Sequence, residues 1–206
     1  MRLSSLDDWR YSLGKILYRS PFYGISLGGG APDGLIMVPP DPWPGDAARG
    51  GPILRGEFRF ADETVRGDRV AWQPVGTSDA WRTALNGFEW LKDLRAVGGD
   101  TARRRARTLI SDWIERHDRW HEHSWRPDVL GRRLYAWLGQ HDFFCASADD
   151  EFRKRCFASI VRQARHLSRT LSHGAAGEGR IASIKALAAA GLCVPGHQAW
   201  PQQALE

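Results

Sequence analysis

The chain has 206 residues, which corresponds to one large domain or one and a half small ones and is enough to bury a substantial core. Hydrophobic residues make up 42% of it and the mean hydropathy is -0.44, with no apolar run long enough to cross a bilayer, so the composition excludes a membrane-spanning protein. The net charge of +5 comes from 29 basic against 24 acidic residues, an excess too small to indicate a nucleic-acid partner.

Residues 1–77 are rich in glycine and proline and predict an N-terminal extension. The first residues lead into Asp7 and Asp8 instead of an apolar stretch, so no signal peptide is expected. The prolines of residues 39–46 restrict the backbone and predict an ordered loop. Residues 53–60 alternate apolar and polar side chains before Thr64 and Val65, which predicts a small β-hairpin that must pack on another element.

Residues 78–206 carry apolar side chains at helical spacing. The side chains expected to point inward are Trp81, Leu85, Phe88, Leu91, Leu94, Ala102, Ala106, Leu109, Ile110, Trp113, Ile114, Val129, Leu130, Leu134, Trp137, Leu138, Phe144, Phe152, Cys156, Ile160, Ala164, Leu167, Leu171, Ile181, Ile184, Leu187 and Ala188. Five long helices and the start of a sixth are expected, at residues 79–97, 101–117, 128–146, 149–172, 181 to about 195, and from 198. Short connections between long helices favour antiparallel hairpins, and the absence of a fixed period argues against a strict helical repeat. The expected fold class is therefore mainly α, an incomplete α/α toroid preceded by the Gly/Pro-rich segment and its hairpin.

Cysteine and histidine give little indication of a metal or redox centre. Cys145, Cys156 and Cys193 are odd in number and lie in apolar helical patterns, which predicts buried thiols in a reducing compartment. His117 and His121 are four residues apart and could lie on one helix face, as zinc ligands do. His123 does not fit this spacing, and no cysteine lies near the pair in the sequence. We expect no metal and no cofactor, and a cytoplasmic or periplasmic location.

Arginine supplies most of the positive charge, and one stretch combines it with aromatic side chains. Pro127 suits the first turn of a helix, and Asp128 beside it favours the positive end of the helix dipole. Arg133 and Trp137, four residues apart, share one face of that helix. A guanidinium binds carboxylate or sulfate in a bidentate manner, and an indole stacks on a sugar ring.

The stretch therefore predicts binding of an acidic sugar. Arg133 and Trp137 are expected to line a cleft, with the other candidates at its mouth. The substrate-binding candidates are Trp125, Arg126, Arg132, Arg133 and Trp137. The alternative interpretation is that the two tryptophans are core residues and the arginines merely solvated, as we also expect for most of the basic run at residues 103–107.

Several segments together resemble the heparinase II/III-like proteins, a family of predicted polysaccharide lyases. They are the loop at residues 38–50, the hairpin around Phe58 and Phe60, residues 86–91, and residues 125–138; residues 163–167 and 186–192 are also similar, so the resemblance covers nearly all of the chain. It implies an incomplete N-terminal α/α toroid followed by a β-sandwich, and β-elimination on a polysaccharide that contains uronic acid.

In that chemistry an Asn or His neutralises the substrate carboxylate, a Tyr or His removes the adjacent proton, and a Tyr protonates the leaving oxygen. The resemblance places those residues in later toroid helices and in the β-sandwich, so no catalytic residue is expected here, and Leu205–Glu206 could derive from a vector. The expected partner is an acidic polysaccharide, either a uronate polymer or a sulfated glycan. The alternative function is a helical scaffold that binds a protein or nucleic acid through its arginine-rich faces.

Overall fold

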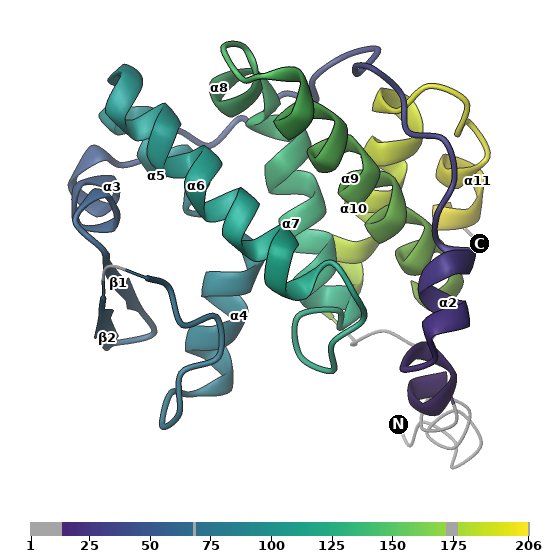
Figure 1. Cartoon of the computed structure of the whole chain (residues 1–206), viewed down its shortest axis with the longest axis horizontal. Coiled ribbons are helices and arrows are strands. Elements are labelled where there is room, and N and C mark those ends of the chain that lie inside the picture. The colour runs from purple at the N-terminus through teal and green to yellow at the C-terminus, as the bar shows by residue number, and fades with distance from the viewer. Residues whose placement is uncertain (1–13, 68, 172–176, 206) are drawn as a thin grey trace.

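The computed structural model describes residues 14–67, 69–171 and 177–205, and this part of the chain is mainly helical with one small antiparallel hairpin (Figure 1). The predictions about Met1–Asp8 and Glu206 lie outside the described residues. The helices and strands are α2 (Pro21–Ser26), α3 (Ala47–Leu54), β1 (Glu57–Phe60), β2 (Glu63–Arg66), α4 (Asp79–Gly87), α5 (Leu91–Val97), α6 (Gly99–His117), α7 (Pro127–Gly139), α8 (His141–Cys145), α9 (Asp150–Thr170), α10 (Glu178–Cys193) and α11 (Trp200–Leu205).

The long helices form two layers. Helices α6, α7, α9 and α10 alternate in direction along the chain, with α6 and α9 side by side in one layer and α4, α7 and α10 behind them (Figure 1). Helix α7 contacts α4, α9 and α10, so it lies at the centre of the fold. Among the described residues no helix combines the length and apolarity needed to cross a membrane.

Small residues let α7 and α10 approach closely. A Cβ at Gly131 would lie 2.8 Å from the Cα atom of Ser183, and the Ser183 hydroxyl donates to the Pro127 carbonyl at 2.8 Å. The buried face of α10 consists mainly of Ser, Ala, Gly and Cys, with Leu187 as its large member. The prediction that Ile181 points inward is wrong, because this contact has no room for a large side chain, and Ile181 is 66% exposed.

The helix expected at residues 79–97 is two helices. Ser78 caps α4 as expected, and its hydroxyl accepts from the Trp81 amide at 3.1 Å. Phe88 then takes a left-handed conformation with φ of 56° and ends α4. The Trp90 indole donates to the Leu85 carbonyl at 2.9 Å, which provides a hydrogen bond to a carbonyl in the last turn of α4. Gly98 ends α5, as the sequence predicts.

The helix expected at residues 128–146 is also divided. Gln140 separates α7 from α8 and is buried. Its side chain accepts from Arg95 at 3.2 Å and donates to Asp41 at 3.2 Å, so it joins the break to α5 and to the N-terminal loop. Apolar spacing does not reveal this break, because the core positions continue in phase across it.

Two short helices lie in the region expected to be loop and hairpin. In α2, Ser20 is the N-cap and Pro21 occupies the first turn. In α3, Asp46 is the N-cap and its carboxylate accepts from the Ala48 amide at 2.8 Å. Glycines and Pro52 hide α3 in the sequence, but Gly50 allows its backbone to lie against α5, where a Cβ would overlap the Asp93 carbonyl.

The predicted hairpin is confirmed. Phe58 pairs with Val65 and Phe60 with Glu63, and the connecting residues Ala61 and Asp62 both have positive φ, as a two-residue type I′ turn requires. Phe58 is buried and its ring lies 6.2 Å from that of Trp90, centroid to centroid. The hairpin therefore packs on the helical core through its apolar face.

Most of the predicted core is confirmed. The predicted apolar sets of α4, α5, α6 and α7 are buried, and so is that of α9 apart from Leu171, which is partly buried. All three cysteines are free and buried, as expected. Aromatic rings fill the centre of the fold. The largest fully buried side chains include Trp81, Phe88, Trp113, Trp125, Trp137, Phe144 and Phe157.

A buried histidine attaches α2 to α9. The Tyr23 hydroxyl lies 2.7 Å from Nδ1 of His166, a side chain that is 1% exposed. Burial lowers the pKa of His166 to about 3, although a hydrogen bond to the Trp125 backbone opposes the shift. The imidazole is therefore neutral at neutral pH, and Nδ1 is the acceptor of the Tyr23 proton.

Acid is expected to destabilise the fold through His166. The unfolded chain binds a proton near pH 6.5 and the folded chain only near pH 3, so the stability is complete above pH 6.5 and falls as the pH decreases between these values. Between pH 6.5 and 4.5 we expect a loss of about 2–3 kcal/mol from this group. Urea unfolding at several pH values measures it. His166→Gln keeps an acceptor without titrating and should flatten this part of the profile; an unchanged profile would contradict the assignment.

Candidate functional site

Arg133, the central residue of the predicted sugar site, lies in the protein core. Its side chain is 0% exposed; Nε donates to Gln163 at 2.8 Å and Nη1 donates to the Asn86 carbonyl at 2.9 Å. The guanidinium carbon lies 4.0 Å from the centroid of the Trp113 ring, a cation–π contact. Burial lowers the pKa of Arg133, and no carboxylate pairs with it among the described residues.

The two tryptophans of the predicted site are core residues as well. Trp137 is 0% exposed, and its ring centroid lies 5.5 Å from that of Trp113. Trp125 is 1% exposed, and its indole donates to the His117 carbonyl at 2.7 Å. The prediction that Arg133, Trp137 and Trp125 contact a sugar is therefore wrong for this structure. Helices α4 and α9, and the Trp113 side chain of α6, cover the face of α7 that carries Arg133 and Trp137.

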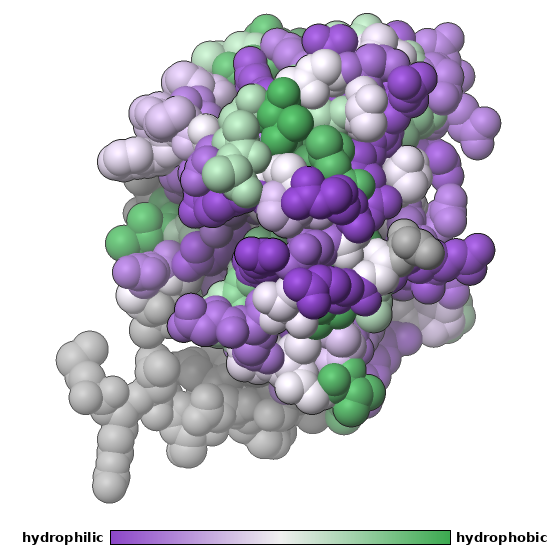
Figure 2. All heavy atoms as spheres, turned by 90° about the vertical axis from the view of Figure 1, so that its left-hand side faces the viewer, coloured by the Kyte–Doolittle hydropathy of each residue, from purple (hydrophilic) through white to green (hydrophobic). Residues whose placement is uncertain are grey.

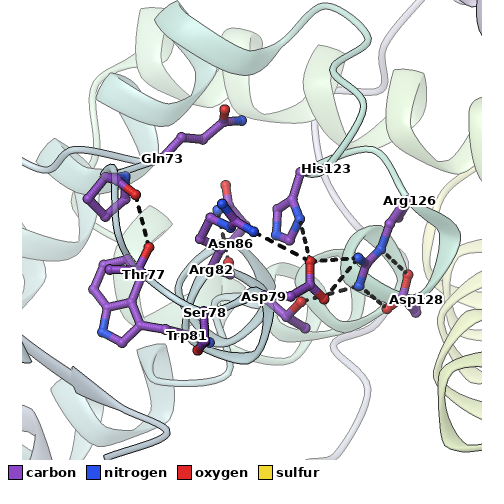
Figure 3. A network of polar contacts seen from close by, with 12 residues as sticks. Gln73, Thr77, Ser78, Asp79, Trp81, Arg82, Asn86, His123, Arg126 and Asp128 are labelled. Carbon is purple, nitrogen blue, oxygen red and sulfur yellow. Dashed lines mark hydrogen bonds and ion pairs between the residues drawn. The ribbon is translucent and has the colours of Figure 1, made fainter. Parts of the chain in front are cut away.

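Arg126 connects the first turns of α4 and α7 (Figure 3). Nη1 donates to both carboxylate oxygens of Asp79, at 2.9 and 3.0 Å. Nε and Nη2 donate to Asp128 at 3.1 and 2.8 Å, and Nη2 also donates to Thr83 at 3.3 Å. All three guanidinium nitrogens of Arg126 therefore take part in these bonds. Binding of a uronate by Arg126 would have to compete with this network, and its role in sugar binding stays a prediction.

The network also sets the charges around Asp79. Burial favours the neutral carboxyl, but the hydrogen bond and charge of Arg126 outweigh it and lower the pKa of Asp79. For Arg126, burial opposes the charge while Asp128 and Asp79 raise the pKa. His123 points its Nδ1 at Asp79, 3.3 Å away, and burial lowers its pKa (Figure 3). The cluster is a neutralised structural contact between two helix N-termini.

The remaining histidines of this region pack as rings. The centroids of His117 and His121 lie 5.3 Å apart, and burial lowers the pKa of both, that of His117 to about 4. Gln73 lies 2.8 Å from Nδ1 of His121. In the described part of the chain, no group of three or more His, Cys, Asp or Glu side chains has the arrangement of a metal site.

Arg132 is the predicted residue that lies at a surface groove. Its guanidinium donates to Glu89 at 3.0 Å, and its side chain is 29% exposed. The groove, here the Trp43 groove, runs between residues 41–43, α5, α7 and α10. It is lined by Asp41, Trp43, Glu89, Lys92, Gly131, Arg132, Tyr135, Ala136, Gln140, Ala182 and Lys185.

The loop that carries Trp43 is held against α7 and α5. The Tyr135 hydroxyl donates to the Pro40 carbonyl at 3.0 Å, and Gln140 donates to Asp41. Gly45 packs directly on the α5 backbone, where a Cβ would overlap the Lys92 carbonyl. These contacts fix the loop, while the Trp43 side chain itself is 71% exposed.

A larger hollow adjoins the Trp43 groove. It has a volume of about 580 Å³, lies between α3, the hairpin and α5, and shares Glu89 and Lys92 with the groove. This volume is within the range of small-ligand pockets. Its walls include Pro52, Ile53 and Phe60. We call it the hairpin hollow, and because it shares Glu89 and Lys92 with the Trp43 groove we treat the two as one candidate site.

The candidate site carries more positive than negative groups. Its cations are Arg49, Arg59, Lys92, Arg132 and Lys185, and its carboxylates are Asp41, Glu89 and Asp93. Each arginine has a carboxylate partner, whereas neither lysine forms an ion pair with a described residue. The Lys185 ammonium lies 3.6 Å from the Tyr135 ring centroid. Figure 2, which views the side that bears α3 and the hairpin, shows a predominantly hydrophilic face.

The sequence interpretation therefore found one lining residue, Arg132, and missed the rest. Trp43 belongs to a segment that the sequence identifies as an ordered loop. A tryptophan in such a loop was the sequence feature that could have indicated a binding residue. Lys92 and Lys185 lie one on α5 and one on α10, and their spacing in the sequence gives no sign that the fold brings them to the same groove.

The fold and the groove define a two-layered helical protein with an attached hairpin, and comparison with known proteins adds one relative. The chain is 36% identical over 138 residues to FtsZ-localized protein C of Caulobacter vibrioides, an alignment that covers 66% of this chain and 24% of that protein. The matched part thus spans about a quarter of the relative's length. No family model and no solved structure was found to match.

Proposed function

We propose that this chain binds an acidic polysaccharide along the Trp43 groove and the hairpin hollow, as the toroid portion of a heparinase II/III-like protein. The two layers of alternating helices would be the incomplete α/α toroid. In the full-length protein the bound polymer would undergo β-elimination, with the reacting groups supplied outside this chain. We expect this chain alone to bind without cleaving.

One observation carries the proposal: an exposed indole stands beside two cations that have no ion-pair partner among the described residues. Trp43 offers a flat apolar face to a sugar ring, and Lys92 and Lys185 are free to meet carboxylate or sulfate groups. Arg132 contributes a third cation, already paired with Glu89. An anionic chain that replaced Glu89 would keep the Arg132 charge neutralised.

The shape of the site favours an extended ligand over a small molecule. The hairpin hollow adjoins the Trp43 groove at Glu89 and Lys92, and its lining includes Arg59 on β1. Cations therefore occur at intervals along one path, as the repeating charges of a uronate or sulfated polymer require. The apolar wall of Ile53 and Phe60 suits the ring faces between those charges.

Removing the free cations is expected to weaken binding. The double variant Lys92→Ala/Lys185→Ala should bind heparin or alginate oligosaccharides roughly tenfold more weakly in calorimetric titration, because each partly exposed charge contact contributes about 0.5–1 kcal/mol. Trp43→Ala should weaken binding by a similar factor through the lost stacking surface. Both changes remove surface side chains, so the folded state should be unaffected.

Lys154→Ala is the matched control, since Lys154 is an exposed lysine on α9 outside the site. It should bind like the parent. Equal affinity of all variants, or no saturable binding by the parent, contradicts the proposal. A tight interaction with duplex DNA that weakens steeply with salt would instead support the arginine-scaffold alternative.

A second candidate function is association with FtsZ polymers, favoured by the similarity to FtsZ-localized protein C. Co-sedimentation of the chain with FtsZ filaments tests it. Pelleting that is unchanged in Lys92→Ala/Lys185→Ala would indicate a contact surface separate from the candidate site. Absence of pelleting at micromolar concentrations of both proteins would count against this function for the present chain.

A further inference from the structure

One ion pair lies where the two parts of the candidate site meet. Glu89 lines both the Trp43 groove and the hairpin hollow, and its carboxylate accepts a hydrogen bond from Nη1 of Arg132 at 3.0 Å. A second carboxylate, that of Glu178 in the first turn of α10, lies 4.0 Å from Nη2 of Arg132. The Arg132 guanidinium therefore has one close and one distant carboxylate, which come from different parts of the fold.

Arg132 is the fixed member of the pair. Its side chain is 29% exposed, and its Nε atom is buried without a hydrogen-bond partner among the described residues. A Cβ at Gly87 would lie 3.3 Å from the Cβ of Arg132, so the base of this side chain packs against the end of α4. The contacts with charged groups are made by Nη1 and Nη2.

Glu89 is the movable member of the pair. The buried side chains of Phe88 and Trp90 on either side of it fix its backbone, but its own side chain is 54% exposed. Within the described part of the chain, Arg132 is its ion-pair partner. An exposed ion pair of this kind contributes little to stability. Arg132 can therefore exchange this carboxylate for another one with little effect on the fold.

We propose that Glu89 is an internal competitor of the ligand, and that a uronate carboxylate binds by replacing Glu89 at Arg132. This inference rests on the proposed function and deepens it, because it names the residue that anchors the ligand and the residue that limits its affinity. The ligand carboxylate contacts Nη1 and Nη2 together, in the bidentate manner that suits a guanidinium. Glu89 bonds Nη1 alone, and Glu178 is too distant from Nη2 for a hydrogen bond.

Glu89 lowers the affinity of the site in two ways. While it is paired, it neutralises the cation that the ligand needs. Once displaced, its negative charge remains where the Trp43 groove and the hairpin hollow meet, and it repels a polyanion that occupies both. The site therefore selects a ligand that brings its own carboxylate to Arg132 over a neutral sugar.

The experiment titrates an alginate hexasaccharide into the parent chain and its variants by calorimetry at one ionic strength. Glu89→Gln should bind about fivefold more tightly and Arg132→Gln about fivefold more weakly, as expected for single, partly exposed charge contacts. In the double variant most of the gain should disappear, because the anchoring cation is absent. Maltohexaose, which is neutral, should bind Glu89→Gln no better than the parent.

Glu178→Gln is the matched control. It changes the net charge by the same amount beside the same guanidinium, but Glu178 is 94% exposed and 4.0 Å away. It should alter the affinity for the hexasaccharide less than twofold. A gain equal to that of Glu89→Gln would indicate a general charge effect and would overturn the inference. A parent that binds and a Glu89→Gln variant with the same affinity would overturn it too, while the proposed function would stand.

A second measurement separates this inference from the proposed function. Glucuronate is titrated into Glu89→Ala and into the parent, and the NMR resonance of the Arg132 Nε–H group is followed. The resonance should shift at about fivefold lower concentration in the variant, because no internal carboxylate competes. If the parent binds no polymer, the proposed function fails, and this shift still supports exchange at Arg132. An Arg132 resonance that does not respond in Glu89→Ala overturns the inference, regardless of polymer binding.

Discussion

Arg133→Ala is expected to destabilise the fold by about 3–5 kcal/mol, the largest effect of any single arginine. The change leaves the Gln163 side-chain oxygen and the Asn86 carbonyl without their donor in the core, and each buried unpaired group costs about 1–3 kcal/mol. It also leaves a void beside Trp113, which adds a cavity cost. Thermal unfolding should shift downwards by roughly 10 °C.

Burying the Arg133 charge has a desolvation cost that the alanine variant no longer bears, which offsets part of the lost stability. A control variant must therefore remove the charge and keep the volume. Arg133 has no carboxylate partner among the described residues, so removing its charge returns part of the cost of burial. Arg133→Met fills most of the volume without the charge and should lose about half as much stability as Arg133→Ala. Arg104→Ala, on the exposed face of α6, should change stability little. An alanine variant as stable as the parent, with weakened sugar binding, would restore a ligand-binding role for Arg133.

Gly45→Ala is expected to cost about 2–3 kcal/mol and to disturb the candidate site directly. A methyl group at this position overlaps the backbone of Lys92, which is unable to move aside as a flexible side chain would. The 39–46 loop must therefore shift away from α5, and Trp43 moves with it. We expect weaker oligosaccharide binding together with lower stability.

Gly34→Ala is the matched control, because no atom lies within 4 Å of the added methyl and its backbone does not require glycine. It should be neutral or slightly stabilising, since alanine restricts the unfolded chain. Urea unfolding and calorimetric titration of both variants make the comparison. A Gly45→Ala variant with the stability and affinity of the parent would show that the loop is not held as the structure indicates.

Periodicity predicted the long helices and most of the core because each helix buries one stripe of apolar residues, and that stripe is local information. The same periodicity joined α4 to α5 and α7 to α8. The breaks depend on partners distant in sequence, such as Arg95 and Asp41 around Gln140. Helix α3 was missed for a related reason. Its glycines argue against a helix in the sequence, but Gly50 allows the close contact between α3 and α5.

The candidate site was predicted least well. A helix that carries Arg, Tyr and Trp has two faces, and spacing alone does not say which one the neighbouring layers cover. Packing buries Arg133 and Trp137 and leaves Arg132 and Tyr135 partly exposed. Neighbouring residues such as Arg132 and Arg133 thus differ in burial. An interpretation based on residue type alone assigned both of them to sugar binding.

Phe88 is a position where local and global preferences conflict. A left-handed backbone favours glycine, and the Phe88 side chain accepts a strain of about 1–2 kcal/mol there. Glycine would relieve the strain but empty the space between Trp72, Trp113 and Trp137, which the ring contacts at centroid distances of 5.3, 6.2 and 5.4 Å. Glycine suits the left-handed backbone but leaves the core space empty, and a large side chain fills the space at the cost of backbone strain. Both requirements therefore limit which substitutions position 88 tolerates. The sharp turn maintained by that compromise also directs α5, and with it Lys92, towards the surface groove.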